Sequence, residues 1–313
     1  MLRSEELNEK GEDFMNKWIK GIAAGLLVLA LGACGSTEEP NAEAETNTGK
    51  GTDANETDIS KEAEKDELTA QEIYQKSLEE SESINSMHAE IAIMQNFKTT
   101  GDEALSMKND IALTMDVVTE PLGLHQKMIV TGDAEGAMDV EMYGEGEELY
   151  LQTPDMEGEW VLIPAEMHEE ILDGMNSSNA MMDLEVFQDF QKEFTLQEED
   201  GEYILNLSAS GEEFSGLMKE LLDQNSMGGE DEASIDNVDV KKIDLTLHID
   251  KETFYTNSFD MKLDAVMDLA GYRTVTIQNI NAEMSQVNEL DELVIPDEVR
   301  NNAVDMSGNK VGE

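Results

Sequence analysis

The stretch FDMKLDAVMDL, residues 259–269, decides the fold of this chain. Its apolar side chains recur at every second position, at Met261, Leu263, Ala265, Met267 and Leu269. Between them stand Lys262, Asp264 and Asp268. Because successive side chains of a β-strand point to opposite faces, this alternation predicts a strand with one apolar face and one solvated face.

The same period of two recurs elsewhere in the chain, in residues 87–97, 136–143 and 244–250. Glycine-containing turn signals separate such runs, at 131–133, 143–147 and 199–202. Clean alternation over long strands favours an antiparallel sheet that buries one face. We therefore expect an α+β fold in which about ten strands form one large curved antiparallel sheet, a half-barrel.

A few helices are expected to cover this sheet. An opening helix places one face on Ile73, Ser77, Leu78, Ser81 and Ile84. One or two short helices are expected in 165–192. Residues 210–225 predict a further helix, in which Ser210 and Glu213 form a capping box ahead of an apolar stripe.

Residues 15–34 have the organisation of a lipoprotein signal. Lys17 and Lys20 precede a small and apolar run, 21–32, which is too short to span a hydrocarbon core of ~30 Å. The run ends in Leu-Gly-Ala-Cys, which matches a lipobox and places the one cysteine of the chain, Cys34, at the fourth position. We expect diacylglycerol on the Cys34 sulfur, whose two acyl chains give stable anchoring in the membrane. The alternative is an ordinary signal peptide or short anchor in which Cys34 is incidental.

The organisation around this signal follows from composition. Residues 1–14 place acids ahead of the basic region, so we interpret them as an upstream extension before the true start at Met15; the alternative is a genuine extension. Residues 34–67 are polar and acidic and predict a disordered tether, with a reach on the order of 30 Å. The half-barrel domain is expected over 68–303, followed by a polar tail, 304–313.

The charge of the chain excludes one class of partner. There are 20 Lys and Arg residues against 71 Asp and Glu, a formal net charge of −51. Such a surface repels phosphate backbones and anionic headgroups, so nucleic acid is not expected as a partner. The acids could bind cations at high capacity, but they are spread along the whole chain, and this favours a solvated surface adapted to the outside of the cell.

The sequence contains little that is typical of catalysis. The four histidines, His88, His125, His168 and His248, make no zinc motif. His88 and His248 are expected on the polar faces of strands, as solvated side chains. Nucleophile elbows, phosphate loops and dinucleotide fingerprints do not occur. We therefore expect no enzyme activity, no metal and no cofactor.

Methionine is the unusual feature, with 20 residues against 8 Phe. Flexible thioethers on an apolar face can adapt to an acyl chain or to varied peptides, or can simply fill gaps beneath a curved sheet. The candidates for lining a ligand cavity are Met138, Met142, Met181, Leu184, Met261 and Met267.

Several short motifs in order resemble an uncharacterised lipoprotein family of Gram-positive bacteria. They are Ser-Met-His-Ala-Glu (86–90), Thr-Glu-Pro-Leu (119–122), Glu-Leu-Tyr-Leu (148–151), Gly-Glu-Trp-Val (158–161), Asn-Ile-Asn-Ala (279–282) and Val-Ile-Pro-Asp-Glu-Val (294–299). The resemblance covers nearly all of 68–303. It implies a fold similar to LolA-like and LppX-like lipoprotein and lipid carriers, a half-barrel closed by helices, and it supplies no catalytic residues.

Two hypotheses of function result. The first is a non-enzymatic lipoprotein on the outer face of the cell membrane of a Gram-positive bacterium, binding an apolar ligand such as a lipid. The second is a surface sensor or chaperone that binds a cell-wall component or a membrane protein. In both, the membrane is a partner through the lipid on Cys34.

Overall fold

The computed structural model describes residues 68–100, 104–133, 137–156, 158–168, 184–212, 214–216, 218, 235–269 and 272–311. The predicted extension, signal segment, lipidation site Cys34 and tether lie outside these residues. So does Met181. Among the described residues, no helix combines the length and the apolar character needed to cross a membrane.

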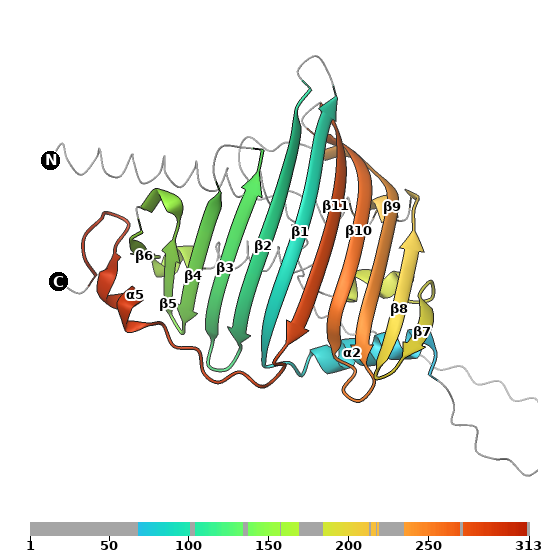
Figure 1. The fold of residues 1–313 in the computed structure, drawn as a ribbon, viewed down its shortest axis with the longest axis horizontal. Helices are drawn as coiled ribbons and strands as arrows, with labels where there is room; N and C mark the ends of the chain where they lie inside the picture. Colours follow the sequence, from blue (N-terminus) through green and yellow to red (C-terminus); the bar gives the residue numbers. More distant parts are fainter. Residues whose placement is uncertain are drawn as a thin grey trace, which may run out of the picture.

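The described strands form one twelve-stranded sheet in the order β12-β6-β5-β4-β3-β2-β1-β11-β10-β9-β8-β7 (Figure 1). The strands are β1 (Ser86–Thr100), β2 (Ser106–Val118), β3 (Gly123–Gly132), β4 (Met138–Glu145), β5 (Glu148–Gln152), β6 (Trp160–Leu162), β7 (Thr195–Glu199), β8 (Glu202–Ala209), β9 (Ile235–Asp250), β10 (Thr256–Leu269), β11 (Tyr272–Ser285) and β12 (Ala303–Val304). All neighbours pair antiparallel except β12 and β6, which are parallel. The predicted fold class is confirmed.

The alternation of side chains sets the two faces of the sheet. On β10, Met261, Leu263, Ala265 and Met267 are buried, while Lys262 is exposed. On β1 and β9 the predicted apolar positions are buried in the same way. The sheet has more strands than the ten or so expected, because β6 and β12 span three and two residues and are too short to alternate detectably.

The helices that the structure describes are short. The opening helix is α2 (Ala70–Ser81), which starts with a capping box between Thr69 and Glu72 and buries Ile73, Tyr74 and Ser77. Single turns of 3-10 helix follow at η1 (Pro154–Met156) and η2 (Ala165–Met167), and a longer one at η4 (Leu184–Phe190). In the predicted helix 210–225, residues 214–216 are helical, but Glu213 of the expected capping box lies outside the described residues.

After β11 the chain forms a strap along the ends of β1–β5 and reaches the far edge of the sheet as α5 (Asp297–Asn302) and β12 (Figure 1). The strap passes Gly123 so closely that a Cβ there would lie 2.8 Å from Cβ of Leu293. Arg300 on α5 holds the strap to the sheet: its Nη2 lies 2.7 Å from Oε2 of Glu145 and 2.8 Å from Oε2 of Glu148. The strap therefore joins the end of the chain to the β4–β5 turn.

Candidate functional site

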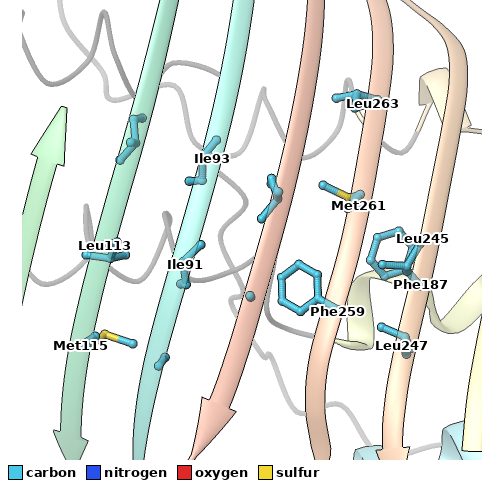
Figure 2. Close-up of a cluster of buried hydrophobic side chains, with 14 of the residues drawn as sticks. Ile91, Ile93, Leu113, Met115, Phe187, Leu245, Leu247, Phe259, Met261 and Leu263 are labelled. Carbon is cyan, nitrogen blue, oxygen red and sulfur yellow. The ribbon is translucent and has the colours of Figure 1, made fainter. Parts of the chain in front are cut away.

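One face of the sheet is apolar from β5 to β8, and we call it the core face. Its buried side chains include Leu151 on β5, Met128 on β3 and Leu205 on β8. Figure 2 shows its central part, with Ile91 and Ile93 on β1, Leu113 and Met115 on β2, Leu245 and Leu247 on β9, and Phe259, Met261 and Leu263 on β10. Eight strand spacings of about 4.8 Å separate β5 from β8, so the face is about 38 Å wide.

Two of the described helices, α2 and η4, pack on the β8–β11 half of this face. α2 contacts β8, and its Tyr74 stacks on Phe194 with ring centroids 5.2 Å apart. Phe190 of η4 stacks on Phe214 at 3.8 Å, and Phe187 belongs to the same apolar cluster. These aromatic residues were not predicted from the sequence, because a 3-10 helix lacks the 3.6-residue period of an amphipathic α-helix.

The predicted cavity residues lie on the core face but not together. Met142, Met261 and Met267 are buried, and Met138 is half-buried against the same cluster. Met142 on β4 and Met267 on β10 are five strand spacings apart, about 24 Å measured along the curved sheet, so they are not neighbours on this face. Leu184 begins η4, but its side chain is not among the described ones, and Met181 lies outside the described residues.

Two glutamines interrupt the core face at its centre. Gln95 on β1 and Gln278 on β11 stand directly opposite each other in the register. Their exposed fractions are 1% and 0%, and all four amide atoms lack a hydrogen-bond partner. Thr276, two residues along β11, is fully buried and its hydroxyl is also unpaired. The signal was visible in the sequence, because Gln95 falls in phase with Ile91 and Ile93.

The opposite face, the outer face, carries a chain of paired polar groups. Nδ1 of His88 lies 2.6 Å from Oδ1 of Asp116, whose other oxygen lies 3.7 Å from Nδ1 of His125. Nε2 of His125 lies 2.9 Å from Oε1 of Glu141. The hydrogen bond with Asp116 raises the pKa of His88 above its ordinary value. His88 lies on the polar face, as expected, but it is a paired side chain and not a freely solvated one.

His125 is further held by stacking. Its ring lies 4.2 Å from that of Tyr143, nearly parallel, and Tyr143 contacts Trp160 in turn. Burial, with the charge of Glu141, raises the pKa of Tyr143. This network orders two histidines on the outer face and leaves their ring nitrogens engaged with carboxylates.

The other two histidines are also paired. Nδ1 of His248 lies 3.3 Å from Oε2 of Glu202, and Nε2 of His168 lies 2.8 Å from the carbonyl oxygen of Ile163. Within the described residues, no group of three or more His, Cys, Asp and Glu side chains has a metal-binding arrangement.

A pocket of about 430 Å³ lies at the β5–β6 edge, where the strap returns. It is lined by Leu162, Ile163, Pro164 and Ala165, by Met306 and Ser307, and by the acids Glu147, Glu148 and Asp305. None of the predicted cavity residues lines it. Ile163 and Met306 of its lining also belong to the apolar cluster of the core face, so the pocket lies at the margin of that face.

A family model described as a family of unknown function, DUF6612, matches residues 69–304. This confirms the predicted resemblance to an uncharacterised family. A search of curated proteins finds no match.

Solved structures give distant matches. A LolA superfamily protein from Nitrosomonas europaea is 13% identical, with 74% of this chain and 97% of that one covered and a TM-score of 0.18. A beta-barrel-like protein of DUF1849 from Brucella abortus is 8% identical, with 64% and 98% covered and a TM-score of 0.20. A DUF1329 family protein from Desulfovibrio piger is 11% identical, with 68% and 90% covered and a TM-score of 0.19.

Proposed function

We propose that this chain, which belongs to the DUF6612 family of unknown function, is a lipid-anchored extracytoplasmic lipoprotein that holds an apolar ligand against its core face. The anchor would be diacylglycerol on Cys34, at the outer face of the cell membrane. The tether would then let the domain move above the headgroups. In this proposal the protein is a binding protein and not an enzyme.

The width of the core face is the observation that carries the binding part of the proposal. The face is apolar over about 38 Å, and the longest helix among the described residues, α2, extends over about 18 Å. Its methionines, among them Met115, Met128 and Met142, are unbranched and can repack around ligands of different shape. An acyl chain fits such a surface because it needs apolar contact without directional bonds.

Anchoring is tested by Cys34→Ser in the full chain. A serine hydroxyl cannot form the thioether, so we expect the protein in the medium or as an uncleaved precursor. Fractionation and mass spectrometry of the N-terminal peptide are the measurements. A processed, detergent-extractable membrane species of the Ser variant would refute the anchor.

Ligand binding is tested by mass spectrometry of organic extracts of the native protein purified from membranes. We expect an apolar molecule in stoichiometric amount, and less of it in a Met142→Asp variant. An extract without such a molecule would instead favour the second hypothesis, in which the protein is a sensor or chaperone that binds a wall component or a membrane protein.

A further inference from the structure

We propose that Gln95, Gln278 and Thr276 bind the uncharged polar head of a neutral lipid, such as a monoacylglycerol or diacylglycerol, whose acyl part lies on the core face. This inference rests on the proposed function and adds the chemical class of the ligand. It assigns a polar recognition site to a largely apolar surface, in which Asn109 and Thr274 are further buried polar residues.

The placement of these residues is the first argument. β1 and β11 pair at the middle of the sheet, so Gln95 and Gln278 sit where its two halves meet. Two residues away on the same face, Ile93 stands opposite Ile280. On the neighbouring strand β10, Leu263 stands opposite Gln278. A ligand head held here would have apolar side chains on either side for its tail.

The unpaired state of the amides is the second argument. Each buried amide that gives up water without gaining a partner destabilises the folded protein. Gln95 and Gln278 face each other, yet neither donates to the other, and no described residue pairs with either. Leucine at both positions would fill the same face without this cost. Amides at this place are therefore explained best by a partner that is not part of the described chain.

The chemistry of the site selects the ligand head. An amide both donates and accepts, and a threonine hydroxyl does the same, so hydroxyl and ester groups are suitable partners. The neighbours in the same register row are Asn109, Leu263 and Ile243, all uncharged. A carboxylate or phosphate would remain without a counter-charge in a low-dielectric site, which is strongly unfavourable. The head is therefore neutral.

Photo-crosslinking in membranes that contain the full chain tests this site. The probes are a diazirine-bearing monoacylglycerol and the fatty acid of the same chain length. We expect the monoacylglycerol to label the wild type more than the fatty acid does, on peptides of the core face. In the double variant Gln95→Leu/Gln278→Leu, labelling should decrease at least tenfold. Its denaturant midpoint should be unchanged or higher than that of the wild type.

Gln126→Leu is the matched control. Gln126 is on the same face, between Met115 and Met142 in the register, but it is only half-buried. Its replacement should leave labelling within twofold. If the double variant does not fold, Thr276→Val, which keeps the shape and removes the hydroxyl, should still reduce labelling.

The outcomes separate the two proposals. Equal labelling of the wild type and the folded double variant would overturn the polar site and leave apolar binding intact, as would unchanged labelling of Thr276→Val. Preference for the fatty acid would overturn the neutral head. Absence of labelling by both probes in the wild type would overturn the proposed function itself.

Discussion

The two faces of the sheet treat their polar residues in opposite ways, and β1 shows both. On the outer face, His88 is paired with Asp116, which is opposite it on β2, and the pairing continues to His125 and Glu141. On the core face, Gln95 is opposite Gln278 and both amides are unpaired. Buried polar groups without a hydrogen-bond partner are rare, because they lose their hydrogen bonds to water and gain none in the folded protein. This difference is the basis of our proposal that the inner amides serve binding, whereas the outer network stabilises the fold.

The largest effect should come from placing the same new charge on each face. Met142→Asp buries an unpaired carboxylate, and we expect a loss of several kcal/mol in the free energy of unfolding, or failure to fold. Met94→Asp is the matched control on the outer face, where the methionine is 46% exposed, and should change the free energy by less than about 0.5 kcal/mol. Urea unfolding in high salt, which screens Asp110 opposite residue 94, measures both.

Equal losses in the two variants would mean that the two faces are not distinct. A mild loss for Met142→Asp together with abolished ligand binding would sharpen the comparison, because it would show that part of the core face is open to water when no ligand is bound.

The next variant separates polarity from shape on the core face. Met142→Leu conserves volume and apolar character, so it should cost less than about 1.5 kcal/mol. Denaturant midpoints give the value, with Met142→Ala as the reference at about 2–5 kcal/mol. If Leu costs as much as Ala, the face is a tightly fitted core at this position and not an adaptable surface.

On the outer face, Asp116→Asn should weaken the network without unfolding the protein. Asp116 is the acid between the two histidines, so its neutral replacement removes two charge-assisted contacts, and we expect a loss of about 1 kcal/mol at pH 6. NMR titration should show a lower pKa for His88. An unchanged pKa would mean that another group, such as Glu90, holds the charge of His88.

The smallest effect is the pH dependence of the same network. The pKa of His88 is raised in the folded state because Asp116 and, more weakly, Glu90 favour its charged form, while burial opposes this. The stabilisation is therefore complete below the unfolded pKa of about 6.5 and is lost as pH rises through the higher folded pKa. The difference in unfolding free energy between wild type and His88→Gln, measured from about pH 5.5 to 8.5, should shrink with rising pH. If this difference in unfolding free energy instead grows with rising pH, the pKa of His88 is not raised in the folded state.

The sequence predicts which face of the sheet each side chain occupies, but it does not predict which strands are neighbours or which residues stand opposite each other. A period of two places Met261 and Leu263 on one face and Lys262 on the other, and the structure agrees. Nothing in that period says which strand lies beside which. The contact between Gln95 and Gln278 joins residues far apart in the chain, and the row from His88 to His125 depends on the register of three strands. Register is set by tertiary packing, which one sequence does not reveal.

The predicted ligand residues illustrate the same limit. Met142 and Met267 share a face, as their positions in the alternating pattern indicate. The strand order nevertheless places them five strand spacings apart. The residues that carry the further inference are instead the two glutamines, which stand out as polar residues in phase with an apolar pattern. The sequence alone shows that each glutamine takes the place of an apolar residue in the alternating pattern. Only the strand register shows that the two glutamines stand opposite each other.

The pairing of β1 with β11 governs how the protein can fold. Strands β1 to β5 follow one another as hairpins, whereas the central pair joins residues about 170 to 200 positions apart, a contact that closes a very long loop. During synthesis or export, β1 must therefore wait with one edge unpaired until residues 272–285 arrive. Assembly of the two halves of the sheet should therefore be slow. An unpaired strand edge can pair with another chain, so association between newly made copies is the main risk during folding.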